Sequence, residues 1–158
     1  MRTPRIYLET TMFNYYFDKE REAHADTVKL FEEIKAGKYV AFTSMYAIRE
    51  LRDAPPDKMS KMLALVDEYG ITTLDFSTEA EQLTEIYMRE KIIPTKYGMD
   101  SLHIAVATVN DLDMILSLNF KHIVRKKTIE LTELVNAREG YHRIGIYTPM
   151  EVVEHEHE

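Results

Sequence analysis

Apolar residues recur along this chain in two alternating patterns. Short continuous apolar runs, bounded by polar or turn residues, are typical of strands buried on both faces of a parallel sheet. They predict strands at 5–8, 39–43, 71–75, 114–118 and 145–148. Stretches in which apolar residues return every third or fourth position indicate helices that bury one stripe. They predict helices at 25–36, 45–51, 57–69, 77–90, 100–109 and 128–137, with a loop or short helix at 12–18 and a loop at 92–98.

The residues between these elements support the same division. Ser44 and Ser77 can cap the helices that follow them, and a glycine stands just past two of the predicted helix ends. Because strands alternate with helices, the fold class is α/β, with a parallel sheet covered by helices on both faces. No linker divides the chain, so we predict a single domain at 1–150 and an acidic flexible tail at 151–158.

The segment from Asp100 to Ile123, DSLHIAVATVNDLDMILSLNFKHI, is the most informative part of the chain. Asp100 begins a predicted helix, and Asn119 follows the predicted strand at 114–118. In open parallel sheets, ligands bind at the carboxyl ends of strands, where helix N-termini also gather. The placement of this acid and this amide therefore points to a binding or catalytic site.

Two further acids occupy comparable positions. Glu9 directly follows the first predicted strand, and Glu50 lies on the inward stripe of the helix that follows the second. If the first and fourth predicted strands are neighbours in the sheet, Glu9, Glu50, Asp100 and Asn119 converge on one crevice.

Convergence of acids has an electrostatic cost that suggests the chemistry. Two carboxylates ~4 Å apart repel by about 4 kcal/mol at an effective dielectric constant of about 20, so protons or cations must offset them. Oxygen ligands without histidine or cysteine suit hard cations such as Mg²⁺ or Mn²⁺. A divalent ion there can bind a phosphate oxygen and lower the pKa of a bound water, which then attacks phosphorus. The four residues together point to metal-assisted phosphodiester hydrolysis, although each acid alone is more often a helix cap or a surface charge.

Four segments together resemble a known family. In chain order they are IYLETT at 6–11, TSMYAIREL at 43–51, DSLHIAVAT at 100–108 and ILSLNFKHI at 115–123. This order is similar to that of PIN domains, and most similar to the bacterial and archaeal type represented by VapC toxins. The resemblance implies a three-layer α/β/α sandwich around a central parallel sheet of about five strands. It also implies a Mg²⁺- or Mn²⁺-dependent ribonuclease site, a cognate antitoxin and a homodimer.

The resemblance assigns roles to individual residues. It places the acidic, metal-binding positions at Glu9, Glu50 and Asp100, and the fourth, auxiliary position at Asn119. The hydroxyl residues that accompany the family's acids fall at Thr10 or Thr11 and at Ser117.

Two of these positions depart from the family's pattern. The first acid is usually Asp, and Glu9 reaches about 1.5 Å further, so a metal would shift or bind through water. If the longer side chain only detunes the metal geometry, Glu9→Asp should raise activity. Asn119 supplies a neutral carbonyl where an anion is often found, which weakens a second metal site.

A basic cluster and one histidine are further candidates for contacts with substrate. Lys121, His122 and Arg125 follow the fourth predicted strand and could contact an RNA backbone, although such a cluster is more often a solvated surface. His103 lies one helical turn after Asp100 and could reach a phosphate or a ligand side chain. Packing on the shoulder of the helix is the more common role of such a histidine.

Aromatic residues and a histidine pair complete the candidates. Tyr7, Tyr15, Tyr16 and Phe17 flank the predicted site and could stack a base, with core packing or a dimer contact as the commoner roles. His155 and His157 form an H-x-H pair in the acidic tail, where disorder is more typical than a zinc site.

The composition limits the classes of function. A net charge of −7 argues against a protein that binds polyanions over its whole surface. No apolar run approaches the ~20 residues of a membrane span, and the charged start MRTPR leads into a strand instead of a signal segment. The chain has no cysteine, which excludes disulfides and thiol chemistry and fits a cytoplasmic location.

The leading hypothesis is therefore a metal-dependent ribonuclease that hydrolyses RNA phosphodiesters, with a metal-bound water as the nucleophile. It could be the toxin of a toxin–antitoxin pair. The alternative is a catalytically weakened PIN-like module that binds RNA or protein, and the departures at Glu9 and Asn119 favour it.

Overall fold

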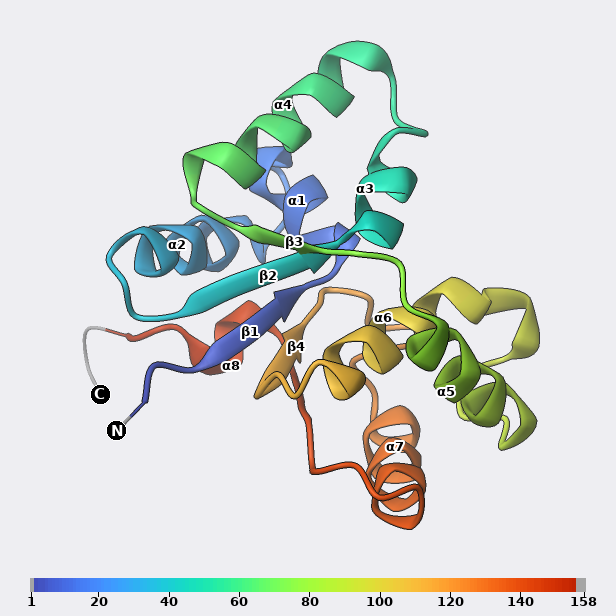
Figure 1. Ribbon diagram of the computed structural model, residues 1–158. Coiled ribbons are helices and arrows are strands. Elements are labelled where there is room, and N and C mark those ends of the chain that lie inside the picture. The colour runs from blue at the N-terminus through green and yellow to red at the C-terminus, as the bar shows by residue number, and fades with distance from the viewer. Residues whose placement is uncertain (1, 156–158) are drawn as a thin grey trace.

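The protein is built on a five-stranded sheet in which every strand pair is parallel, as the computed structural model of residues 2–155 describes it (Figure 1). The strands are β1 (Arg5–Leu8), β2 (Val40–Ser44), β3 (Thr72–Leu74), β4 (Met114–Leu116) and β5 (Gly145–Tyr147). Their order across the sheet is β3-β2-β1-β4-β5. The predicted parallel sheet is confirmed, and the first and fourth strands are neighbours.

Helices connect the strands. They are α1 (Thr10–Phe17), α2 (His24–Lys35), α3 (Met45–Leu51), α4 (Pro56–Glu68), α5 (Thr78–Arg89), α6 (Gly98–Val109), α7 (Lys126–Arg138) and α8 (Pro149–Val152), with a 3₁₀ turn, η1 (Thr95–Tyr97), before α6. Most bounds lie within two or three residues of the predicted ones, because apolar spacing follows the buried stripe of each helix.

The central strand divides the core into two layers. Ile6 and Leu8 of β1 pack into an apolar cluster with residues of α1, α2, α4 and α8, whereas Tyr7 belongs to the opposite cluster with residues of α5, α6 and α7. Successive side chains of a strand point to opposite faces, so one buried strand serves both layers. Figure 1 shows these helices on the two sides of the sheet. The predicted three-layer α/β/α sandwich is confirmed.

Local sequence determines where several elements begin and end. Ser44 and Ser77 accept hydrogen bonds from the N–H groups of Ala47 and Ala80, each at 3.1 Å, and so cap α3 and α5 as predicted. Gly70 ends α4 with a φ of 63°, a left-handed conformation that glycine adopts without steric cost.

The end of the chain differs from its prediction. Residues 151–153 are part of packed structure, because α8 continues to Val152 and Val153 is only 4% exposed. The side chain of Glu151 closes a capping box with Thr148, and the N–H of Glu154 donates to Glu33 at 3.1 Å. The prediction of a flexible tail from residue 151 is therefore wrong for these positions. Residues 156–158, including His157 of the H-x-H pair, lie outside the described residues.

Two further boundaries were predicted imperfectly. Residues 12–18, for which the sequence predicts a loop or short helix, fall mostly in the regular helix α1 (Thr10–Phe17), and α7 begins at Lys126, two residues earlier than predicted. Within residues 2–155, no helix is both long and apolar enough to cross a bilayer.

Candidate active site

Polar side chains from both halves of the sheet meet at the carboxyl ends of β1 and β4. They line a cavity of about 330 Å³. Its polar wall consists of Glu9, Thr10, Thr11, Asn14, Glu50, Asp100 and Asn119, with Leu51, Ala54 and Met62 as its apolar wall. Chain connections leave the sheet in opposite directions at these two strands, and such a switch point is where α/β folds form ligand sites. The structure thus brings together all four residues that the sequence predicted to converge.

Glu9 is held by hydroxyl groups. It is 3% exposed, and its Oε1 accepts hydrogen bonds from Thr11 at 2.5 Å and Ser117 at 2.6 Å. Each of these two hydroxyls also accepts a backbone N–H, from Leu118 at 2.8 Å and Asn119 at 2.9 Å respectively. Because each hydroxyl has one proton, this arrangement directs both protons at Glu9.

Thr10 joins the first acid to the second. Its hydroxyl lies 3.0 Å from Glu9 Oε2 and 3.1 Å from Glu50 Oε1. One hydroxyl proton is therefore shared between two carboxylates. The predicted auxiliary roles of Thr10, Thr11 and Ser117 have a geometric basis, since all three touch a predicted metal ligand.

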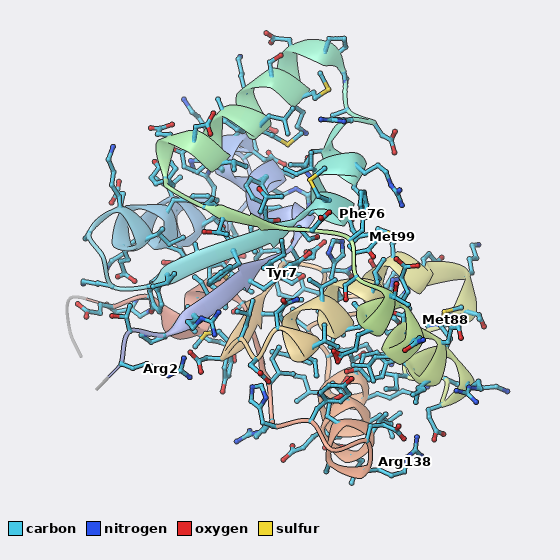
Figure 2. All side chains as sticks on the ribbon, in the orientation of Figure 1. Arg2, Tyr7, Phe76, Met88, Met99 and Arg138 are labelled. Carbon is cyan, nitrogen blue, oxygen red and sulfur yellow. The ribbon has the colours of Figure 1, made fainter. Side chains whose placement is uncertain are left out.

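Glu50 is held by a buried histidine. His103 on α6 is 0% exposed, and its Nε2 donates to Glu50 Oε1. Its Nδ1 lies 2.7 Å from the hydroxyl of Tyr7, which in turn lies 2.7 Å from Ser44 Oγ. Tyr7 sits under the middle of the sheet (Figure 2). A chain of hydrogen bonds through the core thus ends on a carboxylate that lines the cavity.

The Glu50–His103 pair shifts the pKa values of both partners. Burial lowers the pKa of His103, but the hydrogen bond and charge of Glu50, with the charges of Glu9 and Asp100, together raise it by more, so the pKa lies above its ordinary value. Burial raises the pKa of Glu50, but the hydrogen bond and charge of His103, with the hydrogen bond of Thr10, bring it below its ordinary value. Both shifts favour an ionic pair of carboxylate and imidazolium.

Asp100 is held by a second histidine. His122 is 7% exposed, its Nδ1 donates to Asp100 Oδ2 at 2.9 Å, and its ring lies against that of Tyr97 with 4.0 Å between centroids. The side chain is buried and its Nδ1 is bonded to Asp100, and its predicted contact with an RNA backbone stays a prediction. In the structure the residue orients an acid of the cavity.

Asn119 is fixed at the edge of the cavity by a backbone hydrogen bond. Its Oδ1 accepts the N–H of His122 at 2.9 Å. This bond leaves one lone pair of the oxygen and both protons of the NH₂ group available to a ligand. The auxiliary role of Asn119 stays a prediction.

The remaining predicted contacts lie outside the acidic cavity. Lys121 and Arg125 are exposed, and Arg125 Nη1 donates to the backbone carbonyl of Lys121 at 3.3 Å. Neither lines the cavity that contains Glu9. Among the aromatic residues, Tyr7 and Tyr16 are committed to internal packing, Tyr16 through an edge contact with Phe31.

The carboxylate oxygens that remain free in the cavity suit a hard divalent cation. Glu50 Oε2 and Asp100 Oδ1 accept no hydrogen bond from residues 2–155, so each of these acids keeps one oxygen available. The same residues contain no group of three acidic or histidine side chains already close enough to enclose a metal. Mg²⁺ does not require such an enclosure, because it keeps several waters and binds proteins through one or two carboxylates.

Sequence reasoning missed the connections of the two histidines and of Tyr7. One signal was available: a tyrosine in the middle of a fully buried strand needs a partner for its hydroxyl. The identity of that partner could not be read from the sequence, because Tyr7 and His103 are 96 positions apart.

The sheet order, the two helical layers and the acidic cavity together define a PIN-like α/β/α fold. No protein-family model matches the chain, and no curated protein matches it significantly. Solved structures do match. VapC20 of Mycobacterium tuberculosis, a sarcin-ricin loop cleaving toxin, superposes with a TM-score of 0.55 and 13% identity, covering 70% of this chain and 86% of its own.

VapBC2 of Rickettsia felis, solved bound to a DNA fragment from its promoter, superposes with a TM-score of 0.56 and 14% identity. That match covers 91% of this chain and 98% of the other. At such identities the likeness concerns the fold alone, and this chain has a PIN-like α/β/α fold similar to that of these two structures.

Proposed function

We propose that this protein is a metal-dependent endoribonuclease that hydrolyses RNA phosphodiesters in the cavity at the ends of β1 and β4. The observation that carries the proposal is the way in which the acids are held. Glu9, Glu50 and Asp100 line one cavity, and no lysine or arginine of residues 2–155 forms an ion pair with any of them. Acids left without such partners, at a ligand-binding edge of the sheet, are suited to a cation and a phosphate.

In this proposal Glu9, Glu50 and Asp100 hold Mg²⁺ or Mn²⁺. When bound, the ion supplies Lewis-acid polarisation of the phosphodiester and a lower pKa for water. The chain contributes orientation. Thr11 and Ser117 keep Glu9 in place, and the two buried histidines keep Glu50 and Asp100 in place. Hydrogen bonds of this kind fix the orientation of the ligand side chains before a metal binds.

Asn119 contributes in a different way from the family's fourth acid. Its NH₂ group is available at the edge of the cavity, since its oxygen is bonded to His122. We assign it the role of a donor to a non-bridging phosphate oxygen. This role needs no negative charge at the position, which accounts for asparagine there.

The fold neighbours support RNA as the substrate and a regulatory partner. VapC20 is a sarcin-ricin loop cleaving toxin, and VapBC2 was solved bound to a DNA fragment from its promoter. By analogy of fold, and from the resemblance of the four sequence segments to VapC toxins, we propose that this chain is the toxin of a toxin–antitoxin pair and acts as a homodimer.

Calorimetry with the purified protein tests whether it binds a divalent metal. Titration with Mn²⁺ and with Mg²⁺ should give saturable binding, and a mixed RNA pool should be cleaved only when one of these ions is present. Cleavage that persists in EDTA would contradict the proposal. Saturable metal binding without cleavage of any RNA would favour the weakened binding module, which keeps the fold and has lost the reaction.

A further inference from the structure

A second cavity adjoins the acidic one. Its volume is about 510 Å³, and its walls come from α1, the turn after α1, and α4. The two cavities share Asn14, which is fixed by a hydrogen bond from its Nδ2 to the carbonyl of Thr10 at 3.2 Å. The second cavity therefore lies next to the cavity that contains Glu9 and Glu50.

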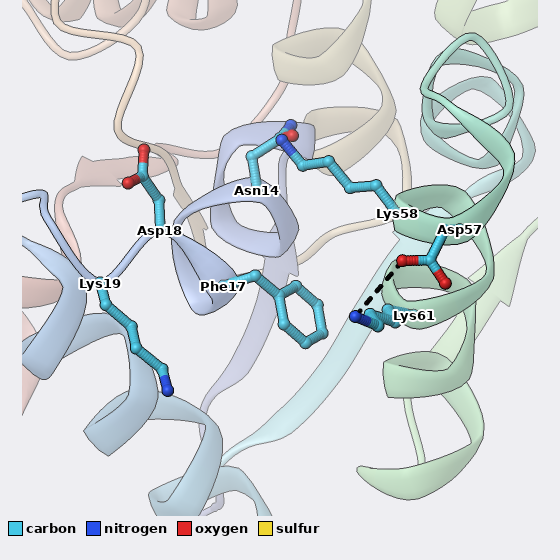
Figure 3. A pocket seen from close by; sticks show the side chains of 7 residues that line it. All are labelled: Asn14, Phe17, Asp18, Lys19, Asp57, Lys58 and Lys61. Atoms are coloured by element: carbon cyan, nitrogen blue, oxygen red, sulfur yellow. Dashed lines mark ion pairs between the residues drawn. The ribbon is translucent and has the colours of Figure 1, made fainter.

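The second cavity combines an aromatic ring with lysines. Figure 3 shows the ring of Phe17 between Lys19 on one side and Lys61 on the other, while Lys58 extends from α4 towards Asn14. Phe17 is half-buried, and an edge contact with Tyr16 at 4.9 Å between centroids supports its ring. One ring surface and several cations in one hollow match the two parts of a nucleotide, its base and its phosphate.

The charges of this cavity do not cancel. Its two acids have partners, since Asp57 pairs with Lys61 at 3.4 Å and Asp18 pairs with Arg21 at 3.1 Å. Lys19 and Lys58 form no ion pair with any residue between 2 and 155. Their ammonium groups are therefore available to an anionic ligand.

We propose that the nucleotide groove, defined by Asn14, Phe17, Lys19 and Lys58, binds the backbone and one base of single-stranded RNA beside the bond to be cleaved. This inference rests on the proposed ribonuclease function and names where its substrate lies. An acidic cavity in a chain of net charge −7 repels RNA, and cations next to that cavity offset the repulsion locally. Phe17, which the sequence marked only as one of four candidate aromatics, becomes the stacking residue.

The basic cluster at the start of α7 is the competing surface. There Lys126 pairs with Glu130 at 3.8 Å, and Arg125 bonds a backbone carbonyl. This cluster lines a separate hollow that shares no residue with the acidic cavity, and α7 lies on the opposite side of the sheet from α4 (Figure 1). The residue shared with the acidic cavity, Asn14, favours the nucleotide groove.

Fluorescence anisotropy tests the groove in an Asp100→Asn background, which removes cleavage during the measurement. The probe is a fluorescein-labelled single-stranded RNA of mixed sequence, about 12 nucleotides long, titrated at several salt concentrations. Lys19→Gln with Lys58→Gln should weaken binding and lower the slope of log affinity against log salt by about 1.4, which corresponds to two phosphate contacts. Phe17→Leu should weaken binding about tenfold without changing that slope, because stacking releases no counterions.

Lys126→Gln with Lys127→Gln is the matched control, since it removes the same charge from α7. If RNA affinity falls equally or more in that control, the proposal for the nucleotide groove is wrong and the RNA binds over α7. If the Asp100→Asn parent does not bind the RNA at all, the proposal is also wrong. Cleavage of the same RNA by the wild type is measured in parallel. If the wild type cleaves but the groove variants bind like the parent, the groove is wrong and the ribonuclease function stands. If the variants lose binding and the wild type never cleaves, the groove binds RNA but the ribonuclease function, and with it the placement beside a scissile bond, is wrong.

Discussion

Carboxylates at the two edges of the sheet differ in their hydrogen-bond partners. At the amino edge, before β4, both oxygens of Asp113 are engaged, one by Arg2 at 2.5 Å and the other by the N–H of Arg5 at 2.7 Å. At the carboxyl edge, Glu50 and Asp100 each bond a histidine through one oxygen and keep the other free of donors from residues 2–155. Asp113, which ties the chain together, therefore has both oxygens bonded to basic or backbone groups, whereas Glu50 and Asp100 each keep one oxygen open to a ligand. Glu9 accepts bonds on both oxygens, but all of them come from hydroxyl groups.

The choice of partner at the carboxyl edge follows from the same difference. An arginine would occupy a carboxylate with two parallel hydrogen bonds and a permanent charge. Hydroxyls and imidazoles donate a single hydrogen bond each, so they orient the acid without saturating it. The repulsion expected between the converging acids is reduced by His103, whose pKa is raised against the lowering effect of burial, chiefly by Glu50.

The largest effect is expected from neutralising one acid at each edge. Asp100→Asn should lower ribonuclease activity by about 10³-fold, because it removes a charge that holds the metal. Its stability should be retained, since Asn still offers an acceptor to His122 and relieves repulsion in the cavity. Asp113→Asn, the matched control, should lose at most about 1 kcal/mol of unfolding free energy, as an exposed ion pair does, with activity unchanged. Comparable activity losses in the two variants would contradict the comparison.

A smaller effect is expected from shortening Glu9. Sequence reasoning predicts that Glu9→Asp raises activity, but the structure reverses the expectation. The carboxylate of Glu9 reaches two hydroxyls, of Thr11 and Ser117, that are already oriented toward it. Shortening the side chain withdraws it from both, so kcat at saturating metal should fall about tenfold, the scale of lost ligand orientation. A rise in kcat would show that metal geometry, and not the hydroxyls, limits this position.

The smallest effect concerns stability and its dependence on pH. His103→Gln should keep a neutral donor near Glu50 and lose the charge, which makes the hydrogen bond about 1 kcal/mol weaker. The raised pKa of His103 gives stability that is complete below its ordinary value of 6.5 and is lost as pH rises through the raised pKa. The lowered pKa of Glu50 gives stability that is complete above 4.5 and is lost as pH falls through the lowered pKa.

The difference in unfolding free energy between wild type and His103→Gln should therefore be largest between about pH 4.5 and 6.5 and shrink on both sides. Urea denaturation at a series of pH values measures it. A difference that is constant across this range would show that His103 and Glu50 do not form an ionic pair.

Much of the fold followed from local patterns. The strands β1 and β4 were predicted because their apolar runs are buried on both faces, and the caps at Ser44 and Ser77 because serine side chains accept the N–H groups of a first helical turn. The acidic residues after Pro149 predict a solvated tail, but the apolar residues among them pack against α2 because they complete its buried stripe.

For the candidate site, the sequence by itself determined which acids stand after strands and at helix starts, since strand ends and helix starts are local properties of the chain. Only the tertiary structure decided what each acid touches. His103 meets Glu50 across 53 positions, and Ser117 meets Glu9 across 108. A hydrogen bond requires two atoms within about 3 Å of each other, and that approach depends on the parallel pairing of β1 with β4 and the packing of α6 beneath them. Periodicity along the chain carries no information about such distances, so the partners of the acids appear only when the sheet has formed.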